Sequence, residues 1–149
     1  MSTITIRPGR VEDAPALRRM EQQNFTDPWS EEGLLSSLAS PLSYIRIAEA
    51  DGRPVGYLIA SRVLDEGELL RIAVDPDSRV RGVGRALTET MMRENPGTKI
   101  WRLDVRVSNY GAIKLYESLG FTPVIRRRNY YEKPAEDGIM MMLETARQD

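Results

Sequence analysis

The spacing of apolar positions along the chain follows two periods, which predict short strands and amphipathic helices. Residues 3–7 alternate polar and apolar side chains, as a strand with one buried face does. Residues 11–24 instead place Leu17 and Met20 at helical spacing. Ser30 is expected to cap a second helix, because it precedes two acidic residues that suit a first helical turn.

The rest of the chain continues the same two patterns. Further strands are expected at residues 43–49, 55–64, 69–74, 100–105, 121–127 and 139–143. Further helices are expected at residues 84–95 and 110–119. The resulting order, β-α-α-β-β-β-α-β-α-β-β, places an antiparallel meander before βαβ units. It therefore predicts a mixed α/β sheet rather than a doubly wound one.

Composition narrows the chemistry that the chain can perform. Its 149 residues suit one domain, and a net charge of −1 gives no support for general nucleic-acid binding. The chain has no cysteine and no histidine, so zinc-thiolate sites and Ser-His-Asp or Cys-His catalysis are excluded. Any general base must be a carboxylate, a tyrosine, a lysine or water. The start lacks an apolar signal-peptide core and nothing approaches a membrane span, so a cytoplasmic protein is expected.

A segment rich in glycine and arginine precedes the helix expected at residues 84–95. It carries the pattern Arg79-x-x-Gly82-x-Gly84. Glycine lets a ligand approach the backbone, and a helix N-terminus attracts anions, so the segment favours phosphate binding. The chain has no Walker loop, and Leu87 stands where a dinucleotide fingerprint needs a third glycine. A glycine-rich turn with solvated arginines fits the pattern about equally well.

Two motifs make the chain resemble the GNAT superfamily of acyl-CoA-dependent N-acyltransferases. One is the Arg-x-x-Gly-x-Gly pattern, and the other is N-x-x-A-I-x-L-Y-E-S-L-G-F at residues 109–121. Residues 25–30, 71–74 and 127–131 resemble, more specifically, the RimI-like ribosomal-protein-alanine N-acetyltransferases. The resemblance implies one domain over residues 1–149 with the GNAT fold. That fold has a mixed, mostly antiparallel sheet of about seven strands flanked by about four helices.

The resemblance also implies an activity. It is transfer of an acetyl group from acetyl-CoA, without a metal, to the N-terminal α-amine of a protein, with a ribosomal protein that begins with alanine as the expected acceptor. Attack in a ternary complex is expected, since no cysteine can form an acyl-enzyme, and a serine intermediate is the remaining alternative. Acetylation of a lysine or a small amine, or non-catalytic acyl-CoA binding, are the alternatives. A monomer or weak dimer that contacts neither membrane nor nucleic acid directly is expected.

The same resemblance assigns the acetyl-CoA contacts. The pantetheine is expected along Ile72, Ala73 and Val74 and at Asn109. The pyrophosphate is expected over a loop that comprises Arg79, Val80, Arg81, Gly82, Val83, Gly84 and Arg85. Residues 72–74 also suit a plain buried strand. Asn109 also suits a helix cap, and both of its roles can coexist.

Two residues match the catalytic pair of the family. Asp104 matches the general base, normally Glu, and its shorter side chain favours a water relay. Tyr116 matches the general acid that protonates the departing thiolate. Alternatively, Asp104 pairs with Arg102 or Arg106 on the same strand face, and Tyr116 only packs in the core.

The acceptor is expected between the loop after the first helix and the last hairpin. Trp29, Tyr130 and Tyr131 are candidate walls, although surface packing would explain them equally well. An N-terminal amine, with a pKa of about 7.7–8.0 against about 10.4 for lysine, is the easier amine to deprotonate. This difference weakly favours an α-amine as the acceptor.

Overall fold

The computed structural model describes residues 3–78 and 80–145. Helices and strands follow the order predicted from the sequence. The first half of the chain forms β1 (Ile4–Pro8), the short 3₁₀ turn η1 (Val11–Asp13), α1 (Ala14–Asn24), α2 (Glu31–Ala39), β2 (Ser43–Ala50), β3 (Arg53–Val63) and β4 (Glu66–Val74). The second half forms α3 (Val83–Glu94), β5 (Ile100–Arg106), α4 (Tyr110–Ser118), β6 (Thr122–Tyr131) and β7 (Glu136–Glu144).

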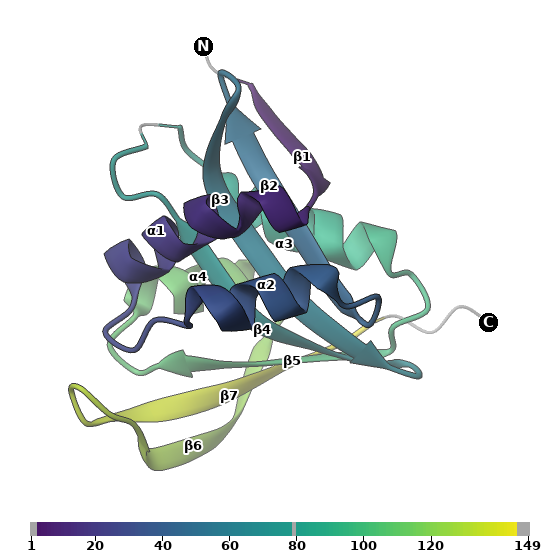
Figure 1. Cartoon of the computed structure of the whole chain (residues 1–149). Helices are drawn as coiled ribbons and strands as arrows, with labels where there is room; N and C mark the ends of the chain where they lie inside the picture. The colour runs from purple at the N-terminus through teal and green to yellow at the C-terminus, as the bar shows by residue number, and fades with distance from the viewer. Residues whose placement is uncertain (1–2, 79, 146–149) are drawn as a thin grey trace.

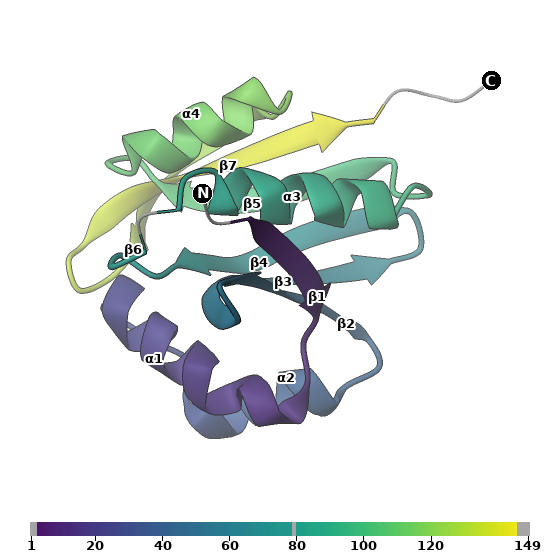
Figure 2. The same ribbon diagram turned by 90° about the horizontal axis from the view of Figure 1, so that it is seen from above.

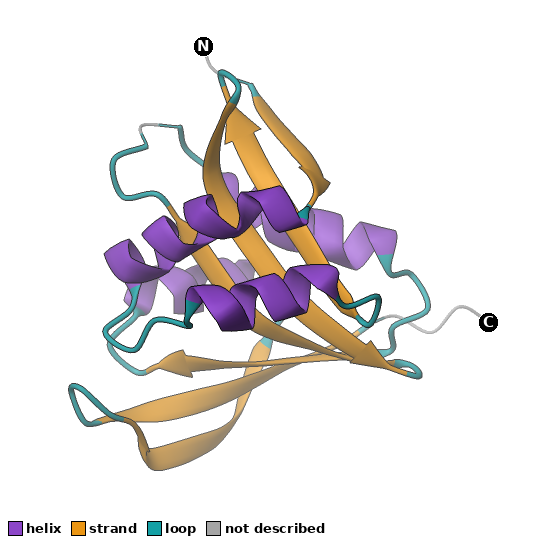
Figure 3. Cartoon of the chain, viewed as in Figure 1, coloured by secondary structure: helices purple, strands orange, loops and turns teal. Residues whose placement is uncertain are grey.

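The described residues form a seven-stranded sheet in the order β1-β2-β3-β4-β5-β7-β6 (Figures 1 and 3). Within this sheet β4 and β5 run parallel, and every other neighbouring pair runs antiparallel. β7 lies between β5 and β6, so the last hairpin returns alongside β5. The predicted mixed, mostly antiparallel sheet is confirmed.

Helices cover both faces of the sheet. Figure 2 shows α1 and α2 on one face and α3 and α4 on the other. Each face has its own apolar core: Leu17, Met20 and Leu34 pack beneath α1 and α2, whereas Leu87 and Trp101 belong to the larger core beneath α3 and α4. None of the described helices is long and apolar enough to span a membrane.

A side-chain cap explains where the second helix begins, whereas a preceding 3₁₀ turn sets the start of the first. The Ser30 hydroxyl accepts a hydrogen bond from the N–H of Gly33 at 3.0 Å, which confirms Ser30 as the cap of α2. The first α-helix begins at Ala14, later than predicted, because η1 precedes it. Asp13 ends η1 with its carboxylate held by the Arg7 guanidinium at 2.8 Å.

The pairing between β4 and β5 is short. Their register comprises three matched positions, which end at Glu68 opposite Arg102. Beyond this point β4 continues to Val74 and β5 to Arg106, and the two strands diverge (Figure 1). Within the described residues, the edge of β4 that faces β5 therefore has no strand partner after Glu68.

A β-bulge lies where β4 leaves β5. Ala60 of β3 pairs with Leu69, but the preceding Ile59 pairs with Arg71, so Leu70 is an additional residue in β4. A bulge bends its strand and re-aims the side chains that follow. Arg71 and Ala73 consequently face α1 and α2.

The last hairpin is longer than predicted. β6 runs on to Tyr131 and β7 begins at Glu136, whereas the sequence predicted a connection over residues 128–138. Asp137 supports the extension, because its carboxylate accepts a hydrogen bond from the N–H of Asn129 at 2.9 Å. The hairpin therefore carries its two tyrosines within strand β6.

Gly67 of β4 lies opposite Trp101 of β5 in the short stretch where these strands pair. A Cβ atom at this position would lie 2.3 Å from Cζ3 of Trp101, whose ring is buried in the core. Only glycine allows the indole to cover the strand at this distance. This contact stands at the last stretch of β4–β5 pairing before the strands diverge.

We therefore expect Gly67→Ala to lower the free energy of unfolding by about 1–3 kcal/mol, because the added methyl overpacks the core. Gly111→Ala is the matched control. Its Cβ would meet no atom within 4 Å, and alanine favours a helix over glycine by about 1 kcal/mol. Urea titrations of both variants check this, and an unchanged midpoint for Gly67→Ala would contradict the packing argument.

Candidate active site

The side chain of Asp104 lies on the face of β5 that points away from the core beneath α3 and α4. Trp101, Leu103 and Val105 alternate with it and are buried beneath α3 and α4, so strand geometry turns Asp104 toward the other face. Its Oδ1 accepts a hydrogen bond from Nε of Arg127 on β6 at 3.0 Å. No other described residue donates to Oδ2, so one oxygen of the carboxylate stays available.

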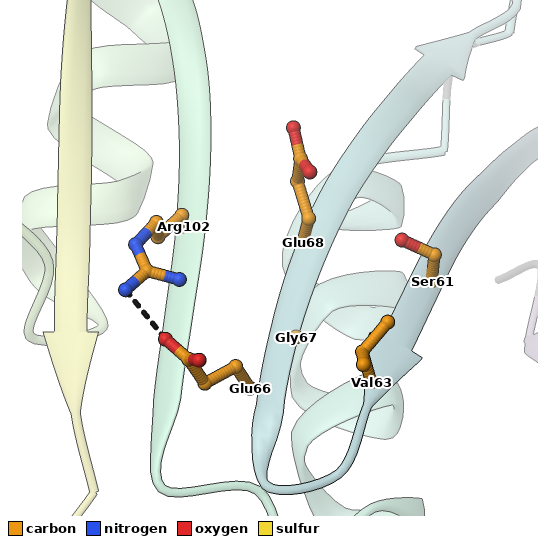
Figure 4. A pocket seen from close by; sticks show the side chains of 6 residues that line it. All are labelled: Ser61, Val63, Glu66, Gly67, Glu68 and Arg102. Atoms are coloured by element: carbon orange, nitrogen blue, oxygen red, sulfur yellow. Dashed lines mark hydrogen bonds and ion pairs between the residues drawn. The ribbon is translucent and has the colours of Figure 1, made fainter.

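The alternative in which Asp104 pairs with Arg102 or Arg106 on β5 is wrong, because Asp104 binds Arg127. Arg102 binds Glu66 of β4 at 2.6 Å, as Figure 4 shows, and Arg106 binds Glu136 of β7 at 3.1 Å. Residues two apart on a strand are separated by about 6.5 Å, whereas side chains on adjacent strands approach to about 5 Å. Each arginine on β5 thus pairs across strands. The sequence did not single out Arg127 as a partner.

Tyr116 combines a packed ring with an available hydroxyl. The ring is buried, with its centroid 5.8 Å from that of Phe121. The hydroxyl donates to no described residue, yet it is not among the fully buried polar atoms that lack a partner. Burial raises the pKa of Tyr116, and the nearby Tyr131 raises it further, so the hydroxyl keeps its proton at neutral pH. Core packing and proton donation are compatible here.

Tyr131 interacts electrostatically with both catalytic candidates. Its pKa is raised to about 12, first by burial and then by the charge of Asp104 and by Tyr130. The guanidinium of Arg106 lies 4.6 Å from the centre of its ring. Since Tyr131 influences the pKa of Tyr116 as well, its side chain lies near both Asp104 and Tyr116. The sequence predicted Tyr131 only as a wall of the acceptor site.

The loop between α1 and α2 faces the same side of the sheet. Trp29, a predicted acceptor wall, donates its backbone N–H to Glu21 at 2.7 Å and lies over the guanidinium of Arg71. The charge of Arg71 also lowers the pKa of Tyr131 on the last hairpin, against the larger effects that raise it. Sequence analysis missed Glu21. The available signal was its position, four residues after Leu17 on the buried face of α1.

The edge of β4 can accept an extended ligand. Ile72, Ala73 and Val74 pair with β3 on one side. Ala73 is buried under α1, and Ile72 and Val74 pack on the larger core. Within the described ranges no strand pairs with the opposite edge, so its backbone N–H and C=O groups are available to an added chain.

The N-terminus of α3 can hold an anion. Gly82 caps the helix with a φ of 81°, a left-handed conformation that favours glycine, and its side-chain position is open. Its carbonyl accepts from Ala86, so the N–H groups of Val83, Gly84 and Arg85 have no acceptor within the helix. These donors and the helix dipole suit a phosphate.

The arginines around this helix start differ in their surroundings. Arg81 is exposed, whereas Arg85 donates a hydrogen bond to the Ser118 hydroxyl of α4. The neighbouring Val80 donates its N–H to the Ser78 hydroxyl at 3.3 Å. Arg79 lies outside the described residues. Arg81 is consequently the described arginine of this loop whose charge is most available to a ligand.

Two surface hollows accompany these elements. One, of about 180 Å³, lies between β3, β4 and β5 where the strands are paired, and Figure 4 shows Glu66, Glu68 and Arg102 around it. The other, of about 760 Å³, lies between α1, the β2–β3 turn and the segment after β4. Neither is lined by Asp104 or Tyr116. The described part of the chain holds no group of three acidic side chains suited to a metal.

Comparison with known proteins decides the family. The model of the acetyltransferase (GNAT) family matches residues 14–121. The chain belongs to this GNAT family. Over 147 residues it is 41% identical to a [ribosomal protein bS18]-alanine N-acetyltransferase of Salmonella typhimurium, covering 96% of this chain and 97% of that protein. It is 36% identical to the N-alpha-acetyltransferase RimI of Mycobacterium tuberculosis, covering 87% and 85% of the two chains.

Solved structures agree with this assignment. The crystal structure of the ribosomal-protein-S18-alanine N-acetyltransferase from Escherichia coli superimposes with a TM-score of 0.91 at 38% identity, over 99% of this chain and 97% of that one. Arabidopsis thaliana NAA60 in complex with acetyl-CoA shares the fold, with a TM-score of 0.85 at 20% identity over 95% and 98% of the chains. The GNAT fold predicted for this chain is confirmed.

Asn109 has a local role in this GNAT chain. Its Oδ1 accepts a hydrogen bond from the N–H of Ala112 at 3.2 Å, so it caps α4 as the sequence allowed. Its side-chain amide donates to no described residue. A contact from this amide to the pantetheine stays a prediction.

The loop before α3 gives a direct test of acetyl-CoA binding. A β-branched side chain cannot adopt the left-handed conformation of Gly82, and at Gly84 it would approach Leu115, 3.4 Å from an added Cβ. We expect acetyl-CoA to raise the melting temperature of the wild-type GNAT chain but not that of the double variant Gly82→Val/Gly84→Val. Gly111→Ala should retain the shift. A full shift in the double variant would place acetyl-CoA elsewhere.

Proposed function

We propose that this protein acetylates the N-terminal α-amine of a ribosomal protein, with alanine as the acceptor residue and acetyl-CoA as the donor. The observation that carries the proposal is the 41% identity to a [ribosomal protein bS18]-alanine N-acetyltransferase, because it extends over 96% of this chain and 97% of that protein. The diverging strands β4 and β5, with Asp104 and Tyr116 beside them, supply suitable chemistry.

Acetyl-CoA would be held by the backbone of two elements. The free edge of β4 at Ile72, Ala73 and Val74 would pair with the pantetheine, and the N–H groups that open α3 would bind the pyrophosphate. When bound, acetyl-CoA supplies the acetyl group as a thioester. Backbone donors need no change of protonation, so the binding site would work over a wide range of pH.

Asp104 would take the proton from the acceptor amine. An ammonium has no lone pair, so a base must remove a proton before attack. Arg127 holds one oxygen of the carboxylate, and the other remains open to a water molecule that relays the proton. An N-terminal amine has a pKa of about 7.7–8.0, so a modest base suffices.

Tyr116 would stabilise the departing thiolate. Its raised pKa keeps the phenol protonated and able to donate. A thiol ionises with a pKa of about 8.5, below that of this phenol, so a hydrogen bond to the developing charge is favoured over early proton transfer. The acceptor chain would lie between Trp29 on the α1–α2 loop and Tyr130 and Tyr131 on β6.

Peptide acetylation tests the function directly. The purified protein is incubated with acetyl-CoA and three acceptors: a peptide with a free N-terminal alanine, the same peptide blocked at its N-terminus but carrying a lysine, and a polyamine. Mass spectrometry should find acetylation of the free α-amine alone. Modification of the lysine peptide or polyamine in its place would assign a different acceptor class, and no modification would indicate a non-catalytic protein.

Tyr116→Phe should lower kcat by about 10²–10³-fold, because the thiolate loses its hydrogen-bond donor. The ring and its packing on Phe121 remain, so affinity for acetyl-CoA should be unchanged. Tyr110→Phe, on the exposed start of the same helix, is the matched control and should keep full activity. Equal kcat values for Tyr116→Phe and wild type would reduce Tyr116 to a packing residue.

Asp104→Asn should reduce the rate at neutral pH by about 10²–10⁴-fold, and raising the pH should restore part of it as the amine deprotonates unaided. Asp104→Glu should keep activity. Glu66→Gln is the control, since it removes an exposed ion pair worth about 0–1 kcal/mol on the same sheet face. Rates and melting temperatures across pH check this, and wild-type turnover for Asp104→Asn would exclude Asp104 as the base.

A further inference from the structure

A buried ion pair joins α1 to β4 beneath the α1–α2 loop. Glu21 is fully buried, and its Oε1 lies 2.9 Å from Nη2 of Arg71. Nε of Arg71 adds contacts of 3.3 and 3.1 Å to the two carboxylate oxygens. The Tyr57 hydroxyl of β3 donates to Oε2 as well. The carboxylate is thus held by two strands of the sheet.

The same pair holds the backbone of the loop. Glu21 accepts the N–H of Trp29 at 2.7 Å, and Nη2 of Arg71 donates to the carbonyl of Asp27 at 3.0 Å. The rings of Phe25 and Trp29 lie 3.6 and 5.2 Å from the guanidinium carbon of Arg71. Residues 25–30 therefore contact this ion pair through both backbone and aromatic groups.

The pair also lies next to the strand segment that faces β5. Arg71 follows the bulge at Leu70 and directly precedes Ile72, where the unpaired edge of β4 continues. Its charge acts on Tyr131 of the last hairpin. Arg71 consequently connects the loop to the β4 edge, with the hairpin close by.

Stability alone gives a weak reason for this arrangement. Removing two charges from water costs free energy that their attraction seldom exceeds, and apolar residues of similar volume serve a core as well or better. Unlike an apolar contact, the ion pair fixes the orientation of the groups that it binds, because each of its hydrogen bonds requires a particular angle and distance. The group fixed in this way is the backbone of the loop, through the N–H of Trp29 and the carbonyl of Asp27.

We infer that Glu21 and Arg71 are positioning residues for acetyl transfer. They hold residues 25–30 at a set distance from the edge of β4, so that an acceptor amine bound against the loop reaches the thioester. Neither residue touches the reacting atoms. The inference rests on the proposed function, since it requires an acceptor that enters over this loop.

The test is the double variant Glu21→Met/Arg71→Met. It keeps side-chain volume and leaves no unpaired buried charge, so the fold should persist. A small misplacement of a bound substrate costs about 10²-fold, and we expect that loss in kcat/KM for an N-terminal alanine peptide. KM for acetyl-CoA and its thermal shift should be unchanged. Tyr57→Phe removes one hydrogen bond to Glu21. It should also lower kcat/KM for the alanine peptide, but by a smaller factor.

A second ion pair supplies the matched control. Glu94 of α3 accepts from the Tyr44 hydroxyl at 2.6 Å and from Nε of Arg46 at 2.7 Å, and Arg46 lies 4.2 Å from the centre of the Tyr44 ring. This pair has the same three side-chain types on the face of the sheet covered by α3, but its carboxylate is exposed and holds no loop backbone. Arg46→Met/Glu94→Met should leave acceptor kinetics unchanged.

Hydrogen exchange separates this inference from the proposed function. Amides of residues 25–27, 29 and 30 should exchange faster in Glu21→Met/Arg71→Met than in wild type or the control, whatever the acceptor. Wild-type acceptor kinetics in that folded variant, unchanged exchange, or an equal loss in the control would each overturn the positioning role. If the wild-type protein fails to acetylate the alanine peptide, the proposed function is wrong, and the exchange experiment still decides whether the pair holds the loop.

Discussion

The short pairing between β4 and β5 is the constraint on which the rest of the site depends. Parallel neighbours in a sheet normally continue their hydrogen bonds along their shared length, but these strands stop after three matched positions. The divergence leaves one edge of β4 without a described partner. Asp104 lies on β5 two residues beyond Arg102, the last position of β5 that pairs with β4. In the proposed mechanism, a donor bound to the β4 edge and a base on β5 would use the opening between these strands.

The charged residues around this opening are largely paired with one another. On β5, Arg102 binds Glu66 and Arg106 binds Glu136, while Asp104 is held from β6. Because the arginine charges are neutralised locally, little unpaired positive charge remains to repel an incoming amine. Asp104 keeps one free oxygen, which is what a water-relayed base requires. In a chain without histidine, a carboxylate and a phenol suffice for the proton movements.

The loop that would face the acceptor is ordered by an interaction beneath it rather than by its own sequence. Residues 25–30 lie between two helices and contain no regular structure, yet buried charges hold their backbone. A loop held this way can present aromatic side chains at a fixed height above the sheet. In the proposed mechanism, the edge of β4 would bind the donor, and this loop of defined position would face the acceptor.

The sequence by itself determined the order of strands and helices, the caps Ser30 and Asn109, and the glycine turn before α3. These features depend on periodicity and on hydrogen bonds between residues a few positions apart. Resemblance to the GNAT family supplied Asp104 and Tyr116. Only the tertiary structure decided that Asp104 pairs with Arg127, 23 residues away, and that Glu21 on α1 pairs across 50 residues with β4. Such partners follow from strand register, a bulge and helix packing. These features depend on residues that are distant in the chain, so no local sequence pattern encodes them.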